Sequence, residues 1–378
     1  MDHKLSVVYS DDFQHYDFGP SHPLKPTRLK LTFELMRSLG LLNASNVDVK
    51  EPRMASMDEL RMFHSEEYLR FVQQMSRTGN GFLDMGDTPA FKGCFEASAL
   101  AVGASLTAVD IVMSDHAKHA INIAGGLHHA HKDRASGFCI CDDPAVAIAY
   151  LKTKYGINKI LYLDVDAHHG DGVMYGFYDD AALLDIDFHE DGRSLFPGTG
   201  FVNEIGEGKA SGLKINIPLP PFMSDEGYLK LFREIVPRAV KKFRPEILLM
   251  QCGADAHAND LLAHLKLTSK TYREAVLIVD GLSHEVSDSR LILFGGGGYN
   301  FANVARTWTL ISATSIGCSL PNEIPEGWRK LFEALVGEPA PTTLDSECAY
   351  HDLPENVVSE VVSSTLAKLK AKIDLLGS

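Results

Sequence analysis

The sequence lacks the features that mark nucleic-acid-binding, secreted and membrane-spanning proteins. It has no run of basic residues, and 50 acidic residues against 36 basic ones leave a net charge of −14. Because a nucleic-acid groove needs clustered positive charge, we expect no nucleic-acid partner. The first residues, MDHKLSVVYSDD, show no signal-peptide pattern. No stretch approaches the roughly 20 apolar residues of a membrane span, so we expect no membrane partner.

Cysteine is scarce, and internal repeats and low-complexity tracts are lacking. The six cysteines are scattered and form no C-x-x-C pair. In a chain of 378 residues this pattern indicates reduced, mostly buried thiols and a cytoplasmic protein. The hydrophobic content of 45% is enough for a large core, and α/β chains of this length often form one domain. We therefore expect a single domain over residues 1–378.

Short apolar segments alternate with longer helical patterns through most of the chain. The predicted strands are 5–9, 120–123, 160–165, 183–188, 214–217, 247–251 and 291–294. The predicted helices are 28–39, 57–63, 66–75, 94–113, 144–155, 226–243, 270–284, 301–316 and 358–375. This alternation predicts an α/β fold with a mostly parallel sheet and helices on both of its faces.

Clusters of polar residues follow five of the predicted strands. In chain order they read GGLHHAH, DAHHGDG, HEDGRSLFPGTG, GADAHAND and GGGGYN. Open parallel sheets place their ligand crevice at the carboxyl ends of the strands, so all five clusters are predicted to meet at one edge.

The segment LYLDVDAHHGDG supplies the first candidate metal ligands. Asp166 and His168 leave the end of a buried strand together, and a carboxylate with an imidazole suits a divalent ion such as Zn²⁺. Asp255 is the preferred third ligand because it follows its own strand as Asp166 does. His257 and Asp260 are its rivals. Three protein ligands leave a position for water, which the metal would activate. Oxygen and imidazole ligands also accept Fe²⁺.

Two adjacent histidines are the candidate acid and base. His128 and His129 follow a pair of glycines, and two carboxylates, Asp164 and Asp171, have no metal to bind. Each carboxylate could hold one imidazole through Nδ1, which fixes its tautomer and raises its basicity. Two such pairs beside one metal suit general acid and general base catalysis.

Tyr299 follows four consecutive glycines after a buried strand. The run lacks the residues of a phosphate-binding loop. It lets the chain turn tightly and direct the tyrosine hydroxyl inward, where it could donate a hydrogen bond to an oxyanion opposite the metal. A tyrosine stacked on a loop is the alternative interpretation.

Taken together, GGLHHA, ASGFC, LDVDAHHGDG, FPGTG, QCGAD and GGGGYN resemble the motifs of the histone deacetylase superfamily. The sequence is most similar to the class I-like acetoin utilization deacetylases of bacteria and archaea. The resemblance covers about residues 5–320, which leaves a C-terminal helical extension over about 325–378. It implies the arginase/deacetylase fold, with an eight-stranded parallel sheet, and zinc-dependent hydrolysis of N6-acetyl-lysine to acetate and lysine. It also implies the roles given above for the catalytic and metal-binding residues.

Further residues receive roles only from the resemblance. It implies that the lysine methylenes pass through a narrow tunnel, that an aspartate at its rim binds the substrate backbone, and that an arginine lines the cavity through which acetate leaves. The tunnel residues are Gly137, Phe138, Phe196 and Leu262, the rim residue is Asp87, and the cavity residue is Arg28.

The resemblance also implies a structural or modulating K⁺ ion behind the catalytic metal. Its site would be formed by Asp164, Asp166, His168, Asp187 and Phe188. Asp187 stands where relatives commonly have serine or threonine. Its carboxylate could bind the cation more tightly, shift neighbouring pKa values, or rotate away.

The leading hypothesis is a deacetylase of acetylated proteins or peptides, with an acyl-CoA synthetase as one possible partner and an open oligomeric state. Metal and Tyr299 would polarise the carbonyl, while His129 and His128 would activate the water and protonate the leaving amine. Three alternatives remain: an amidohydrolase of small acetylated amines such as acetylpolyamines, a binuclear manganese ureohydrolase, and an inactive acyl-lysine reader. The acetoin-utilization resemblance is associational evidence for the substrate.

Overall fold

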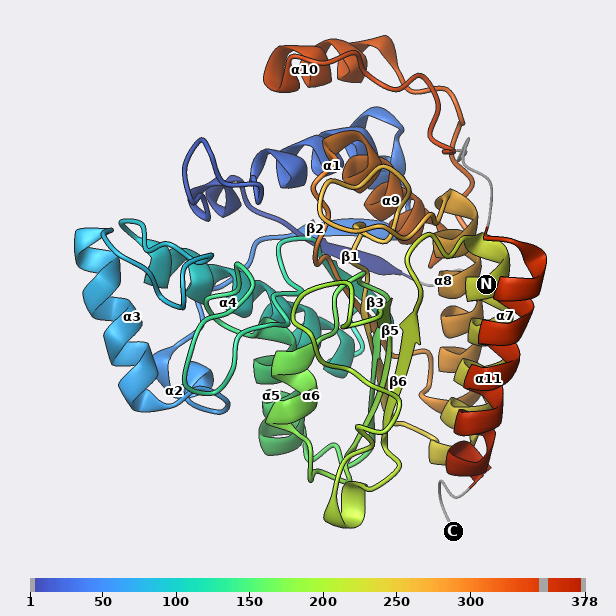
Figure 1. The fold of residues 1–378 in the computed structure, drawn as a ribbon. Coiled ribbons are helices and arrows are strands. Elements are labelled where there is room, and N and C mark those ends of the chain that lie inside the picture. The colour runs from blue at the N-terminus through green and yellow to red at the C-terminus, as the bar shows by residue number, and fades with distance from the viewer. Residues whose placement is uncertain (1–3, 347–352, 375–378) are drawn as a thin grey trace.

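Eight short strands form one parallel sheet at the centre of the molecule (Figure 1). The structure is a computed structural model that describes residues 4–346 and 353–374. The strands are β1 (Leu5–Val8), β2 (Val47–Lys50), β3 (His119–Asn122), β4 (Ile160–Asp164), β5 (Leu183–Glu190), β6 (Lys214–Leu219), β7 (Ile247–Gln251) and β8 (Leu291–Phe294). Their order across the sheet is β2-β1-β3-β8-β7-β4-β5-β6, and every neighbouring pair is parallel.

The seven strands predicted from the sequence are all present, which confirms the α/β fold, and the eighth is β2 at the edge of the sheet. Apolar patterning did not indicate β2 because its sequence, VDVK, contains only two apolar residues. Val49, one of these two, is itself 41% exposed. Only the parallel register with β1, in which Leu5 pairs with Val47, identifies the segment as a strand.

Helices cover both faces of the sheet. The helices of the described residues are α1 (Thr27–Ser38), α2 (Met57–Leu60), α3 (Glu66–Thr78), α4 (Cys94–Met113), α5 (Asp143–Tyr155), α6 (Asp171–Gly176), α7 (Asp225–Phe243), α8 (Ser269–Val286), α9 (Phe301–Thr314), α10 (Glu326–Val336) and α11 (Glu355–Asp374). In Figure 1, α4, α5 and α6 lie on one side of the sheet, and α7 and α8 lie on the other. The nine predicted helices are present, and α6 and α10 were not predicted; position 375, the last of the predicted C-terminal helix, lies outside the described residues.

α4 is long and apolar enough to cross a membrane by length and composition. The expectation that no stretch approaches a membrane span is therefore wrong for this helix. However, 67% of its most apolar window is buried inside the protein, as in the core helix of an α/β domain. Its small residues permit close packing, since a Cβ atom at Gly103 would lie 1.8 Å from the carbonyl oxygen of Arg53.

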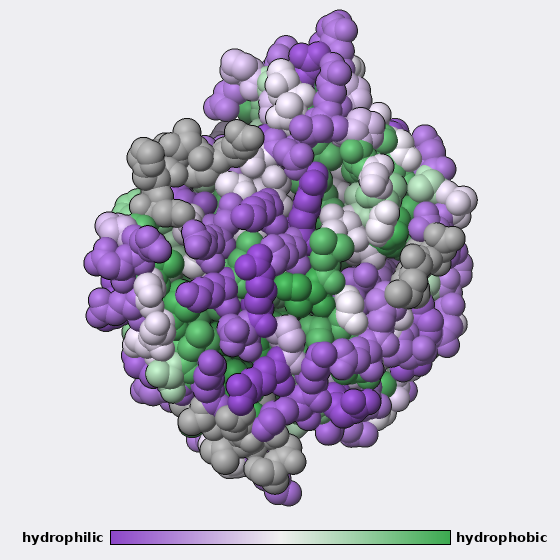
Figure 2. All heavy atoms as spheres, turned by 90° about the vertical axis from the view of Figure 1, so that its right-hand side faces the viewer, coloured by the Kyte–Doolittle hydropathy of each residue, from purple (hydrophilic) through white to green (hydrophobic). Residues whose placement is uncertain are grey.

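The C-terminal helix α11 packs against α7, outside the sheet (Figure 1). Val362, Leu369 and Ile373 are its buried apolar side chains. Figure 2 views this side of the molecule and shows hydrophilic side chains over most of it, with hydrophobic ones between them near the centre. The five cysteines among the described residues are free, and four of them are buried, as expected; Cys348 lies outside the described residues.

A second apolar cluster joins the start and the end of the chain. Leu31 and Leu35 of α1 pack with Trp328 and Phe332 of α10, and all four are at most 1% exposed. The indole Nε1–H of Trp328 also donates a hydrogen bond of 2.9 Å to the carbonyl of Leu31. α10 is thus part of the folded domain although it lies beyond the last strand.

We expect Trp328→Ala to lower the free energy of unfolding by about 3–5 kcal/mol, because it removes a fully buried aromatic side chain and leaves a cavity. Leu335→Ala, on the same helix but at a position that is 44% exposed, is the control and should change stability by less than about 0.5 kcal/mol. Urea unfolding measures both. Equal effects of the two substitutions would show that α10 does not contribute to the hydrophobic core.

Candidate active site

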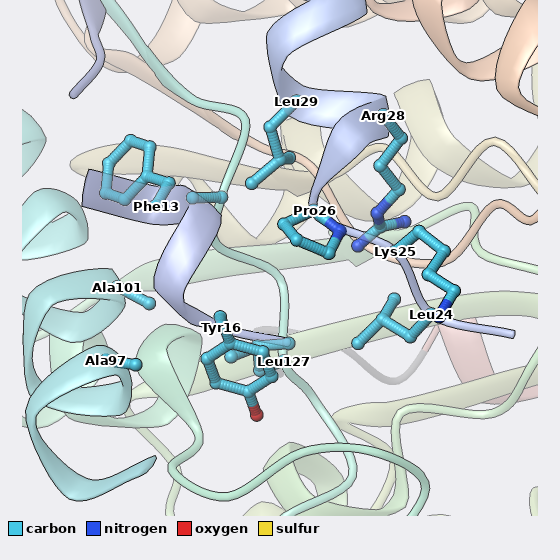
Figure 3. Close-up of a pocket in the computed structure, with 11 residues that line it drawn as sticks. Phe13, Tyr16, Leu24, Lys25, Pro26, Arg28, Leu29, Ala97, Ala101 and Leu127 are labelled. Carbon is cyan, nitrogen blue, oxygen red and sulfur yellow. The ribbon is translucent and has the colours of Figure 1, made fainter. Parts of the chain in front are cut away.

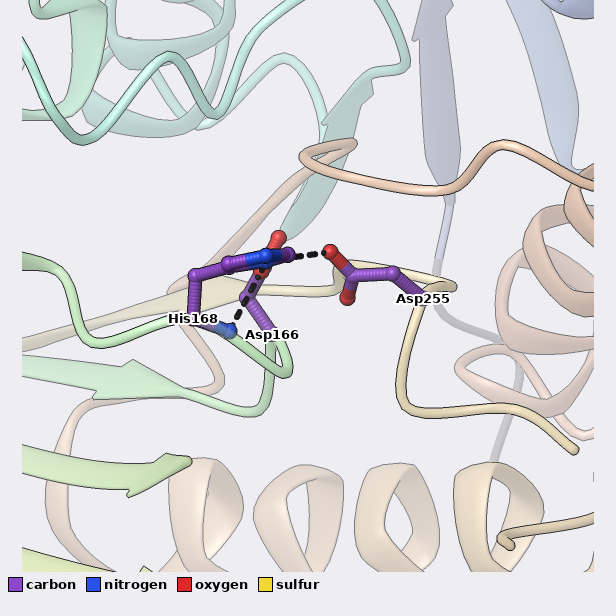
Figure 4. Close-up of side chains that lie close together, drawn as sticks. All are labelled: Asp166, His168 and Asp255. Atoms are coloured by element: carbon purple, nitrogen blue, oxygen red, sulfur yellow. Dashed lines mark hydrogen bonds and ion pairs between the residues drawn. The ribbon is translucent and has the colours of Figure 1, made fainter. Parts of the chain in front are cut away.

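The neighbouring strands β4 and β7 bring the candidate metal ligands together. Asp164 is paired with Gln251 in the sheet, so the turns that follow the two strands leave the same edge side by side. Asp166, His168 and Asp255 each offer a ligand atom, and these atoms all lie within 4.8 Å of one another. Figure 4 shows the three side chains pointing toward a common centre.

Hydrogen bonds fix the orientation of this group. His168 Nδ1 lies 2.9 Å from Asp255 Oδ2 and 3.3 Å from Asp166 Oδ1. The outer carboxylate oxygens accept backbone N–H groups: Asp166 Oδ2 from Gly297 at 2.7 Å, and Asp255 Oδ1 from Ala167 at 2.8 Å. These backbone hydrogen bonds orient each carboxylate so that its other oxygen faces the centre of the group.

Two carboxylates buried this close together require a positive partner. Burial and the charge of Asp166 raise the pKa of Asp255 to about 7. Although burial favours neutral imidazole, the hydrogen bonds that His168 donates to the carboxylates of Asp166 and Asp255 raise its pKa to about 10. A divalent ion would replace that proton, since a ligand histidine must be neutral. The donor set therefore fits a cation such as Zn²⁺ or Fe²⁺.

The two rival ligands lie elsewhere. His257 bonds to the Ala258 carbonyl through Nδ1 and contacts the Ser346 hydroxyl through Nε2. Asp260 accepts the backbone N–H groups of Leu262 and Tyr299, at 2.9 and 2.8 Å. Among residues 4–346 and 353–374, the group of Asp166, His168 and Asp255 is the only one with metal-ligand geometry.

Each of the two adjacent histidines has a carboxylate partner. His128 Nδ1 lies 2.8 Å from Asp164 Oδ2, and His129 Nδ1 lies 2.7 Å from Asp171 Oδ1. The opposite nitrogens, both Nε2, lie 3.1 Å apart. All four residues are buried, at 5% exposure or less. The structure thus forms the two pairs expected from the sequence.

The two histidines differ in charge. Burial opposes protonation of both, but the charges of Asp164 and Asp166 outweigh it at His128 and raise its pKa well above the usual value. At His129, burial and the neighbouring charge of His128 lower the pKa to about 4. Groups whose environments separate their pKa values in this way can act as an acid and a base at one pH.

Tyr299 reaches the same site from the turn after β8. Its ring lines a small cavity together with His128, His129, Asp166 and His168. The preceding glycines are needed for this approach, because a Cβ atom at Gly297 would lie 2.1 Å from Asp255 Oδ2. Burial and the charges of Asp255 and Asp166 raise the pKa of the phenol well above its usual value, so the hydroxyl keeps its proton.

Two of the expected tunnel residues, Gly137 and Phe138, line this cavity, and the other two, Phe196 and Leu262, lie near residues that do. Gly137, with φ at +54°, lies against His129 and Phe196: an added Cβ atom would come within 2.4 and 2.9 Å of their rings. The Phe196 ring lies 5.1 Å from that of His129, and the Phe138 ring lies 5.9 Å from that of Tyr299. Leu262 is half-buried near Tyr299, since Asp260 binds the backbone N–H of both.

Asp87 lies at the surface in the loop between α3 and α4. Partial burial and the neighbouring carboxylate of Asp84 raise its pKa to about 6. Its Oδ1 accepts a hydrogen bond of 3.1 Å from the Thr88 hydroxyl, and the carboxylate also interacts with the N–H of Gly137. Asp87 is therefore attached to the segment that carries Gly137 and Phe138.

A second cavity, of about 20 Å³, continues from the first. Leu24, Arg28 and Leu127 line both cavities. In Figure 3 the Arg28 side chain extends from the first turn of α1 towards Leu24. Its guanidinium donates to the carbonyls of Gly296 and Gly298 at 2.7 and 3.2 Å. The volume is enough for a water molecule beside a buried positive charge.

The residues expected to bind a monovalent cation include two members of the metal group, Asp166 and His168. Asp164 Oδ1 accepts the backbone N–H of Asp166 at 2.9 Å. Both oxygens of the Asp187 carboxylate have partners: Oδ2 accepts the Gly170 N–H at 2.7 Å, and Oδ1 lies 2.6 Å from His189 Nδ1. Phe188 points to the opposite face of β5, where it packs on Tyr228 and Phe232.

Several supporting residues were not found from the sequence. Asp143, at the start of α5, accepts the N–H groups of Gly126 and Leu127 at 3.1 and 2.8 Å and so fixes the turn before His128. His131 lies with Nε2 3.2 Å from Asp171 Oδ2 and is a second partner of that carboxylate. His131 stands in the GGLHHAH cluster, but its spacing gave no sign of this contact.

We expect Asp255→Ala to weaken binding of a divalent ion by more than about tenfold, because it removes one of three ligands. His257→Gln, two residues away and outside the metal group, is the matched control and should keep one ion per chain. Metal content after dialysis against a metal buffer measures both. Loss of the ion from His257→Gln alone would identify His257 as the true ligand.

Comparison with known proteins agrees with this geometry. The sequence matches the histone deacetylase domain family over residues 22–315. It is 40% identical over 329 residues to the acetoin utilization protein AcuC of Bacillus subtilis (strain 168), covering 85% of this chain and 84% of that protein. The AcuC protein of Staphylococcus xylosus is 35% identical over 349 residues, 90% of this chain and 85% of that protein.

A human relative is similar over almost the whole chain. Histone deacetylase 1 of Homo sapiens is 32% identical over 378 residues, which cover 98% of this chain and 74% of that protein. The domain match and the relatives support a metal-dependent deacetylase. The chain belongs to the histone deacetylase family.

Proposed function

We propose that the protein is a zinc-dependent deacetylase that hydrolyses the N6-acetyl-lysine amide in proteins or peptides. The observation that carries the proposal is the convergence of two His–Asp pairs and Tyr299 on one buried Asp–His–Asp group. A cation held by that group would polarise the acetyl carbonyl and acidify a water molecule.

The protein side chains supply the proton transfers. His129, neutral because its pKa is low, accepts a proton at Nε2 from the attacking water. The Tyr299 hydroxyl donates a hydrogen bond to the carbonyl oxygen as it gains negative charge. His128, held protonated by Asp164, donates its Nε2 proton to the lysine nitrogen as the C–N bond breaks. The 3.1 Å between the two Nε2 atoms places base and acid at the same reacting centre.

The tunnel and its rim select the substrate. Gly137, Phe138, Phe196 and Leu262 form apolar walls for the lysine methylenes, and Asp87 at the rim accepts backbone N–H groups of the peptide. Acetate leaves past Arg28, whose buried guanidinium attracts the anion. The free amine leaves by the way it entered.

The proposal includes two ions and a cellular setting. Zn²⁺ is the proposed catalytic ion, and Fe²⁺ suits the same ligands. K⁺ is proposed to bind behind it among Asp164, Asp166, His168, Asp187 and Phe188. The proposed substrate is a cytoplasmic acetylated protein, with acyl-CoA synthetases as a first class to test.

A binuclear ureohydrolase would need carboxylates for a second metal. Asp164 and Asp171 are instead each within 2.8 Å of a histidine nitrogen. A ureohydrolase would also leave Tyr299 without a role, and an inactive reader would leave both His–Asp pairs without one. The geometry therefore supports hydrolysis of an acyl amide over both alternatives.

We expect Tyr299→Phe to lower kcat on an acetyl-lysine peptide by about 10²–10³, with little change in KM, because it removes a donor to the oxyanion. Tyr155→Phe, on α5 and bonded to Asp110 at 2.7 Å, is the control and should keep full activity. Acetate release by the zinc-loaded protein measures both. Unchanged turnover in Tyr299→Phe would contradict the mechanism, and cleavage of acetylpolyamines without cleavage of peptides would contradict the substrate class.

The rim carboxylate predicts a pH dependence of peptide recognition. Because the pKa of Asp87 is raised to about 6, its charge, and with it the binding of peptide N–H groups, is present above pH 6 and lost as pH falls through 6. We expect the ratio of kcat/KM for a peptide to kcat/KM for an acetylated alkylamine to fall from pH 7.5 to pH 5. The alkylamine corrects for titration of the catalytic groups. In Asp87→Asn the ratio should be low and independent of pH; a ratio that still changes would assign the titration to another group.

A further inference from the structure

Thr88 stands between the rim of the tunnel and its wall. It is fully buried, at 0% exposure, although its neighbour Asp87 reaches the surface. Its hydroxyl accepts a hydrogen bond of 3.1 Å from the backbone N–H of Phe138 and donates one of 3.1 Å to Asp87 Oδ1. One hydroxyl thus joins two chain segments that are 50 residues apart in sequence.

The backbone of Phe138 needs such support. Its φ angle is +68°, a left-handed conformation that is unfavourable for a bulky aromatic residue. A strained residue of this kind persists only where its surroundings hold it. Thr88 holds the N–H of Phe138, and the Tyr16 hydroxyl donates to its carbonyl at 2.9 Å.

The position of the Phe138 ring bears directly on the reaction. The ring packs edge-on against Tyr299, with centroids 5.9 Å apart, and lines the same cavity as His128 and His129. The His22 ring also lies 4.4 Å from the Phe138 ring. His22 Nε2 also lies 3.1 Å from the carbonyl oxygen of Asp87. Phe138 therefore contacts Tyr299 at the reacting centre, and through His22 it is also connected to Asp87 at the rim.

We propose that Thr88 is a positioning residue that couples the rim carboxylate to the tunnel wall. Through the Thr88 hydroxyl, Asp87 helps to hold Phe138 in its strained conformation. Phe138 in turn positions the acyl-lysine stem and the Tyr299 ring. The kinetic part of this inference rests on the proposed function. Its consequence is that loss of the hydroxyl affects even a substrate with no peptide backbone for Asp87 to bind.

Thr88→Val and Thr88→Ser form a matched pair, since valine keeps the shape without the hydroxyl and serine keeps the hydroxyl. The substrates are an acetyl-lysine peptide and N-acetyl-pentylamine, which enters the tunnel but lacks a backbone. We expect Thr88→Val to lower kcat/KM about tenfold on the alkylamine and further on the peptide, because a buried N–H and a carboxylate each lose a partner. Thr88→Ser should stay within about twofold of the original protein on both.

Tyr16→Phe separates the wall from the rim. It removes the other support of Phe138 without touching Asp87, so it should lower kcat/KM by similar factors on the two substrates. An unchanged alkylamine rate in Thr88→Val, with only the peptide rate reduced, would overturn the coupling and leave Thr88 as a support of Asp87 alone. Equal losses in the serine and valine variants would assign the effect to packing and also overturn it.

Amide hydrogen exchange at Phe138 tests the coupling without turnover. Exchange should be at least about tenfold faster in Thr88→Val than in the original protein or in Thr88→Ser, because the N–H loses its acceptor. Equal exchange in all three proteins would overturn the inference even if the kinetics changed. If the original protein cleaves neither substrate, the proposed function fails, and the exchange result still decides whether Thr88 holds the wall.

Discussion

The site depends on negative charge buried at the carboxyl edge of the sheet. Asp164, Asp166 and Asp255 are each 0% exposed: Asp164 ends β4, and the other two follow the neighbouring strands β4 and β7. Burial of unpaired carboxylates is costly, so the surrounding groups must supply positive charge or hydrogen-bond donors. His128 supplies charge, the backbone supplies N–H groups, and a divalent ion would supply the rest in place of the proton on His168. The metal affinity and the acid–base asymmetry of the site thus have one electrostatic origin.

The same charge explains why His128 and His129, adjacent in sequence and similarly buried, behave differently. His128 faces Asp164 and, beyond it, Asp166, so the charged form is favoured. The resulting imidazolium then disfavours a second proton on His129. The hydrogen bond and the charge of Asp171 favour that proton, but they do not outweigh burial and the charge of His128. Two similar residues thereby acquire the opposite roles that amide hydrolysis requires.

The walls of the site are assembled from loops that are distant in sequence. Gly137 and Phe138 come from the segment before α5, Phe196 from the segment after β5, and Asp87 from the loop before α4. Loops of this kind have little structure of their own, so buried hydrogen bonds through Thr88 and Tyr16 hold them in place. The rigid sheet fixes the reacting groups, and these side-chain contacts fix the shape of the substrate path.

The sequence alone determined the strand pattern and the residues of the metal group and the His–Asp pairs. Asp164 ends an apolar strand and the others lie in segments that follow such strands, and a parallel sheet gathers these positions at one edge. It did not determine β2, whose sequence has no apolar run, or α10, which is defined by Trp328 meeting α1. Nor did it reveal the parts played by Asp143, His131 and Thr88. Their partners are set by which loops meet in space, and only the tertiary structure decided that.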